Sequence, residues 1–197
     1  MDEALAEIWE GRDEDLPIDS PADLVILASI VERETGLASE RPQVAAVFVN
    51  RLRVGMRLQS DPTIIYGITL GQGSLGRGLR RSEIDQVPPY NTYQIDGLPA
   101  GPIANPGIDS LRAVAHPDEH DYLYFVAKGA VPSDGHVFAE TYAEHQQNVA
   151  AYREIERQAA EDAAGAEAQA EMDAIEAEEA AEAGDAAATE APAAESL

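Results

Sequence analysis

The fold is organised around residues 20–34, whose sequence is SPADLVILASIVERE. Ser20 is a typical helix N-cap, Pro21 suits the first helical position, and Asp23 lies near the positive end of the helix dipole. The apolar run in the middle is interrupted by a single serine and leaves almost no polar face. We therefore expect a buried central helix, with Gly36 as its C-terminal cap.

Helical and strand patterns continue on the C-terminal side of this stretch. Glycines and prolines are frequent between Gly55 and Gly107, which predicts a face of the domain built from loops. The sequence predicts a mainly helical α+β fold with a small two-stranded element and a closing C-terminal helix. The expected elements are a helix over 39–52, short helical pieces at 63–66 and 82–86, a helix over 108–115, strands at 122–127 and 136–138, and a helix over 141–153.

Charge divides the chain into three parts. The formal net charge is −24, of which residues 1–19 carry −7, residues 20–153 carry −4 and residues 154–197 carry −13. We interpret residues 1–19 as an N-terminal connecting segment and residues 20–153 as the folded domain. The last part contains 18 alanines and no aromatic residue. We expect it to be an acidic Ala/Glu-rich tail, first a frayed helix and then disordered.

Composition also excludes several classes of protein. The acidic balance argues against nucleic acid as a partner, since such binding relies on a surplus of Lys and Arg. Cysteine is absent, which excludes disulfides, thiolate metal sites and cysteine nucleophiles. His116 and His120 have the spacing of helical ligands, but Pro117 between them opposes a helix, so we expect no metal and no cofactor. No apolar stretch approaches the roughly 20 residues of a spanning helix.

Glu34 is the carboxylate that the helical pattern singles out. It lies three, four and seven residues after Val31, Ile30 and Leu27, at the end of the apolar face. A carboxyl group there loses hydration, which raises its pKa, as a general acid working near neutral pH requires. Glu32 lies on another side of the same helix and is a lesser candidate. The pattern alone also fits an ordinary surface glutamate in the last turn.

Residues 90–93, Tyr-Asn-Thr-Tyr, place two aromatic rings beside amide and hydroxyl donors. Sugar sites favour this mixture, because rings stack on sugar faces while polar groups bind hydroxyl and acetamide groups. The same four residues could equally form a structural turn.

Eight segments along the chain stand out in combination: ASIVERET (28–35), VFVNRL (47–52), GMRLQSDPT (55–63), YNTY (90–93), GLP (97–99), PIANPG (102–107), YLYFVA (122–127) and HVF (136–138). Together they resemble the endolytic murein transglycosylases of the YceG-like family, in the family's order from about Asp15 to Arg153. The resemblance implies a lytic transglycosylase whose domain is distantly similar to lysozyme-like transglycosylases. It implies Glu34 as the catalytic residue, and as substrate-binding residues Gln59, Asp61, Tyr66, Asn91, Thr92 and Tyr93.

The resemblance also implies a reaction and a setting. Such an enzyme cleaves the MurNAc–GlcNAc bond within peptidoglycan glycan strands, leaves 1,6-anhydro-MurNAc ends and terminates nascent strands. Peptidoglycan synthases are the implied partners, and the periplasmic face of the bacterial inner membrane is the implied location. Members carry an N-terminal membrane helix and a LysM-like domain. Neither is found in this sequence, so we expect it to be part of a longer protein.

Three other functions stay open at this level. A lysozyme-type hydrolase would use Asp61 as a second carboxylate. A non-catalytic peptidoglycan-binding module would bind strands without cleaving them. A scaffold would act through the acidic tail of residues 154–197.

Overall fold

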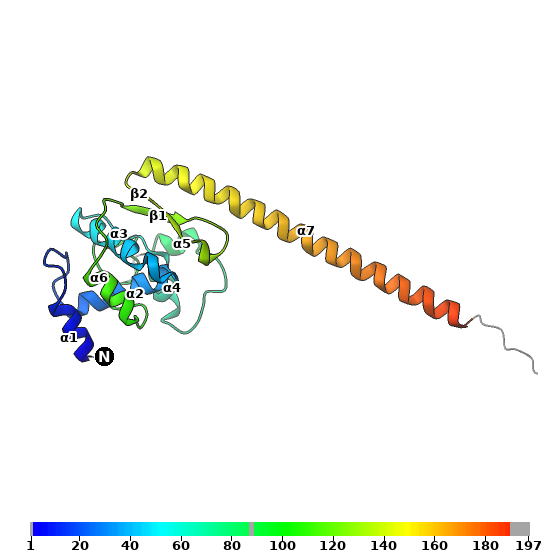
Figure 1. Cartoon of the computed structure of the whole chain (residues 1–197), viewed down its shortest axis with the longest axis horizontal. Helices are drawn as coiled ribbons and strands as arrows, with labels where there is room; N and C mark the ends of the chain where they lie inside the picture. The colour runs from blue at the N-terminus through cyan, green and yellow to red at the C-terminus, as the bar shows by residue number, and fades with distance from the viewer. Residues whose placement is uncertain (1, 87–88, 190–197) are drawn as a thin grey trace, which may run out of the picture. The chain divides into compact units, whose positions relative to one another are not determined.

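The computed structural model of the chain describes residues 2–86 and 89–189. The described part is mainly helical and carries one two-stranded antiparallel sheet (Figure 1). Its helices and strands, in chain order, are α1 (Asp2–Glu10), α2 (Pro21–Glu34), the 3₁₀ turn η1 (Ala38–Glu40), α3 (Arg41–Arg53), α4 (Asp61–Thr69), α5 (Arg81–Ile84), α6 (Ile108–Ala115), β1 (Tyr124–Ala127), the 3₁₀ turn η2 (Pro132–Asp134), β2 (His136–Ala139) and α7 (Tyr142–Thr189).

Helix α2 forms as the sequence predicts at its beginning and differs at its end. The Ser20 hydroxyl accepts a hydrogen bond from the Asp23 N–H, which confirms the N-cap. The C-cap is Thr35 in an extended conformation, so the assignment of Gly36 to this position was wrong. The Thr35 hydroxyl accepts the Leu37 N–H, which turns the chain away from the helix axis without a glycine in the left-handed region.

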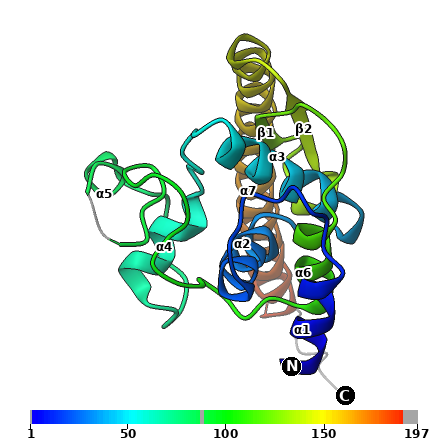
Figure 2. The same cartoon turned by 90° about the vertical axis from the view of Figure 1, so that its left-hand side faces the viewer.

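The core lies around α2. This helix packs against α3 and α6, and Figure 2 shows α2 beside α6. Leu24, Leu27, Ile30 and Val31 are completely buried, and each contributes about 2 kcal/mol of hydrophobic stabilisation. The α6 boundaries match the prediction. The second predicted helix is instead a 3₁₀ turn followed by α3, because Pro42 favours the first turn of a new helix.

The two strands form one antiparallel hairpin in which Phe125 pairs with Phe138. The sheet is confirmed, although β1 begins at Tyr124 rather than at residue 122, and β2 extends to Ala139. Phe125 packs edge-on against Phe48 of α3, with ring centroids 5.8 Å apart. This contact joins the hairpin to the helical core.

The chain separates into two compact units, residues 1–152 and residues 153–197. Helix α7 begins in the first unit and continues to Thr189. Residues 153–174 are almost entirely exposed, and ion pairs one helical turn apart, such as Arg157 with Glu161, lie along them. Residues 190–197 of the expected tail lie outside the described residues. Among the described helices, none is long and apolar enough to cross a membrane.

Candidate functional site

Glu34 occupies the last position of α2, where the helix leaves the core. Its Oε1 accepts a hydrogen bond of 2.6 Å from the Ser60 hydroxyl. Burial, together with the nearby Asp61 charge, raises the pKa of Glu34 to about 7 against the opposing effects of the Ser60 hydrogen bond and the Arg51 charge. At neutral pH about half of these carboxyl groups therefore hold a proton, as a general acid requires.

Ser60 is held by buried threonines behind it. Its backbone N–H donates to the Thr92 hydroxyl at 2.9 Å, and its carbonyl accepts the Thr63 hydroxyl at 2.6 Å. The preceding residue, Gln59, has a φ of +50°, a left-handed conformation that costs a non-glycine residue of order 1 kcal/mol. Such strain is common at functional sites, and here it accompanies the turn that presents Ser60 to Glu34.

A pocket of about 330 Å³ opens beside Glu34. Asp61 lines it, and its Oδ1 accepts a 2.6 Å hydrogen bond from the Tyr93 hydroxyl. Burial and the Asp61 carboxylate both raise the pKa of Tyr93, so this phenol stays protonated. The remaining residues that line the pocket are Arg51, Leu58, Gln59, Tyr124, Phe125, Tyr142 and His145.

Glu34 also borders a second cavity, of about 250 Å³. Thr35, Gly36, Ala127 and His136 are among the residues that line it. Two separate cavities therefore adjoin Glu34.

Glu32, the lesser candidate, forms hydrogen bonds that link α2 to the beginning of α6. Its Oε2 accepts the Ser110 hydroxyl at 2.6 Å and the Gly107 N–H at 3.1 Å, which caps the beginning of α6. The Ser110 hydrogen bond holds the pKa of Glu32 below its usual value. Glu32 is therefore ionised at neutral pH and cannot donate a proton.

The other site residues proposed from the sequence separate into two groups. Gln59, Asp61 and Tyr93 line the pocket beside Glu34. Asn91 and Thr92 are completely buried, so their side chains are not exposed for direct contact with a ligand. The Asn91 amide donates to backbone carbonyls of residues 84 and 86 and accepts the Tyr93 N–H.

Tyr66 is not brought to Glu34. Its ring packs against Tyr90, with centroids 4.8 Å apart, and it lines a different cavity with Arg33 and Ile103. Direct contact with a sugar bound beside Glu34 is not supported by this position.

Sequence reasoning missed Ser60, Arg51 and His145. No base lies near Ser60 in the sequence, whereas in the fold its hydroxyl contacts the Glu34 carboxyl group across 26 positions. Arg51 interrupts the apolar pattern of α3, and a buried arginine in that pattern was the available signal. No pattern indicated that His145 of α7 would stack on Tyr124, with ring centroids 5.1 Å apart.

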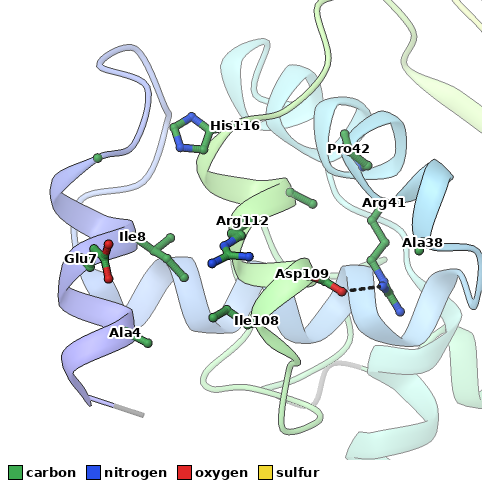
Figure 3. Close-up of a pocket in the computed structure, with 12 residues that line it drawn as sticks. Ala4, Glu7, Ile8, Ala38, Arg41, Pro42, Ile108, Asp109, Arg112 and His116 are labelled. Carbon is green, nitrogen blue, oxygen red and sulfur yellow. Dashed lines mark ion pairs between the residues drawn. The ribbon is translucent and has the colours of Figure 1, made fainter.

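A further cavity, of about 540 Å³, lies between α1, α6 and the beginning of α3 (Figure 3). Arg41 and Asp109 form an ion pair of 3.8 Å across it. Ile8 and Ile108 contribute apolar surface. None of the site residues expected from the sequence lines this cavity.

Comparison with known proteins decides the family. The model of the YceG-like family matches residues 1–151. The chain belongs to the YceG-like family. An endolytic murein transglycosylase of Bacillus subtilis (strain 168) is 45% identical to this YceG-like chain over 123 residues, or 62% of this chain and 32% of that protein.

Two further relatives agree with this assignment. An endolytic murein transglycosylase of Streptococcus pneumoniae (strain D39) is 36% identical over 136 residues, 65% of this chain and 23% of that protein. The crystal structure of a putative YceG-like protein from Listeria monocytogenes is 33% identical with a TM-score of 0.58, over 74% of this chain and 42% of that one. This YceG-like chain thus spans at most about a third of the length of these two curated relatives.

Proposed function

We propose that this chain is the catalytic part of a lytic transglycosylase that cleaves the MurNAc–GlcNAc bond within peptidoglycan glycan strands. The observation that carries the proposal is the half-buried Glu34 carboxyl group at the edge of an open pocket, where desolvation raises its pKa to about 7. The names of the Bacillus and Streptococcus relatives, both endolytic murein transglycosylases, support the choice of substrate.

In the proposed reaction, the Glu34 carboxylic acid donates its proton to the glycosidic oxygen, and the bond from C1 of MurNAc to that oxygen breaks. The GlcNAc unit leaves with a free 4-hydroxyl. The Glu34 carboxylate then takes the proton of the MurNAc C6 hydroxyl, and the oxygen of this hydroxyl bonds to C1 of the same sugar. A 1,6-anhydro ring forms, Glu34 is protonated again, and no water is consumed.

Ser60 supports both halves of this cycle. Its hydroxyl fixes the orientation of the Glu34 carboxyl group, and its hydrogen bond stabilises the carboxylate formed after proton donation. Because burial destabilises that carboxylate, the same group is basic enough to accept the second proton. One residue can therefore act first as acid and then as base.

The surroundings of Asp61 favour this reaction over hydrolysis. A hydrolase needs a second carboxylate as nucleophile or to activate water. One Asp61 oxygen is already engaged by the Tyr93 hydroxyl, which fits a positioning role better. The two cavities that adjoin Glu34 support cleavage within a strand, since an endolytic enzyme must hold sugars on both sides of the bond.

The family resemblance supports three finer proposals. We propose a fold distantly similar to lysozyme-like transglycosylases, a location at the periplasmic face of the inner membrane in a longer membrane-anchored protein, and peptidoglycan synthases as partners. Termination of nascent strands is the role proposed within that setting.

Digestion of purified glycan strands by the wild type and by Glu34→Gln tests the proposal. Gln keeps the size and an oxygen that can accept the Ser60 hydroxyl, but it cannot transfer the proton. We expect wild-type products one water lighter than reducing-end products in mass spectrometry, and none from the variant. Binding without cleavage by the wild type would favour the non-catalytic module instead.

A further inference from the structure

Arg51 is a buried cation without a carboxylate partner. Its side chain lies on α3 among apolar neighbours, and the residue is only 7% exposed. Nε donates to the Leu123 carbonyl and Nη1 to the Leu58 carbonyl, each at 2.6 Å. No Asp or Glu of residues 2–86 or 89–189 forms an ion pair with this guanidinium.

The third nitrogen of Arg51, Nη2, is the group left for a ligand. It makes no hydrogen bond within the described part of the chain, and Arg51 lines the pocket beside Glu34. Burial lowers the pKa of Arg51, yet a guanidinium stays protonated at neutral pH. Removing a cation from water without a counter-charge is unfavourable, and such an arrangement favours a ligand that brings acceptor oxygens.

Neither of the two acidic side chains that line this pocket forms an ion pair with Arg51. Glu34 is protonated in the catalytically competent form. Asp61 already accepts the Tyr93 hydroxyl. Among the residues that line the pocket in the described ranges, Arg51 is the only arginine or lysine.

The proposed substrate presents one matching group. MurNAc and GlcNAc alternate along the strand and differ only in the lactyl ether on O3 of MurNAc. The lactyl carboxyl group offers acceptor oxygens both as a free acid and as an amide to a stem peptide. An enzyme that cleaves on one side of MurNAc must distinguish the two sugars by this group.

We infer that Arg51 is a specificity-determining residue, whose free guanidinium edge binds the lactyl carboxyl oxygens of MurNAc and so sets the register of the strand across Glu34. The inference rests on the proposed function and adds the group by which the substrate is recognised. The two carbonyl contacts of Arg51 hold the guanidinium in place before the sugar binds, which reduces the entropy lost on binding.

The test compares two tetrasaccharides by isothermal titration calorimetry against the Glu34→Gln protein, which binds without cleaving. One alternates GlcNAc and MurNAc with free lactyl groups, and the other is chitotetraose, which has the same β-1,4 backbone and no lactyl group. We expect the muramyl ligand to bind at least about tenfold more tightly, as a hydrogen bond to a charged group provides. In Glu34→Gln/Arg51→Gln the two affinities should become equal.

Arg53→Gln is the matched control, because Arg53 lies on the same helix, is exposed and does not line the pocket. It should leave the affinity ratio unchanged. If Arg51 has a purely structural role, Arg51→Gln should lower the affinity for both tetrasaccharides by the same factor and leave the ratio of the two affinities unchanged. This result would overturn the inference.

The outcome does not depend on the folding of one variant. Equal affinities for the two ligands in the Glu34→Gln protein overturn the inference by themselves, even if Arg51→Gln does not fold. Arg51→Lys, which keeps the charge but not the planar fork, should retain part of the preference. If the folded Glu34→Gln protein binds neither tetrasaccharide, the proposed function fails as well.

Discussion

Replacing Glu34 with glutamine should stabilise the fold while abolishing the proposed activity. Burial raises the pKa of Glu34 from 4.5 to about 7, so ionising the carboxyl group is harder in the folded chain than in the unfolded one. Stability from this group is fully present below pH 4.5 and is lost as pH rises to about 7. The full shift corresponds to about 3 kcal/mol.

The side chain borders an open pocket, and solvent there reduces the cost of ionisation. We therefore expect Glu34→Gln to raise the free energy of unfolding by about 1–3 kcal/mol at pH 8 and by almost nothing at pH 4. Urea unfolding followed by circular dichroism between pH 4 and pH 8 measures this difference.

Glu32→Gln is the matched control with the opposite sign. The Ser110 and Gly107 hydrogen bonds lower the pKa of Glu32, so its carboxylate stabilises the fold above pH 4.5, and this contribution is lost as pH falls through its folded pKa. Glu32→Gln should reduce stability at pH 7 by less than about 1 kcal/mol, since the group is partly exposed. The reasoning for Glu34 would be refuted if Glu34→Gln lowered the free energy of unfolding at pH 8, or if it changed this free energy by the same amount at every pH.

Three other predictions concern the same site. Cleavage by the wild type should decline above about pH 7, approaching tenfold per pH unit as Glu34 loses its proton, and a kcat/KM profile that stays flat to pH 9 would exclude this group as the acid. Ser60→Ala removes a hydrogen bond that lowers the Glu34 pKa, so this decline should move to higher pH; a shift to lower pH would contradict the assigned donor. Thr92→Val leaves the buried Ser60 N–H without its acceptor and should lower the free energy of unfolding by about 1–3 kcal/mol in urea titrations; an unchanged midpoint would show that this contact contributes little.

The sequence predicts the parts of this protein that depend on local patterns. The N-cap at Ser20, the burial of α2 and the boundaries of α6 follow from helix signals within a few residues. The apolar positions before Glu34 predict a desolvated carboxyl group, and the pKa of about 7 agrees with that expectation. The family itself was recognisable from the motifs, and the family match confirms it.

What the sequence could not predict depends on contacts between distant segments. Ser60 lies 26 positions after Glu34, and its backbone is held by the hydroxyl groups of Thr63 and Thr92, which come from later segments of the chain. Asn91 is a residue type that often binds sugars, but its amide group donates its hydrogen bonds to the backbone carbonyls of residues 84 and 86. Residue type and spacing do not distinguish these two uses.

Digestion of glycan strands in oxygen-18 water tests the central claim most directly. A single acid–base residue that uses the C6 hydroxyl as internal nucleophile should yield 1,6-anhydro ends without oxygen-18, and Glu34→Gln should yield no products. Reducing ends that carry oxygen-18, or undiminished cleavage by Glu34→Gln, would contradict the account.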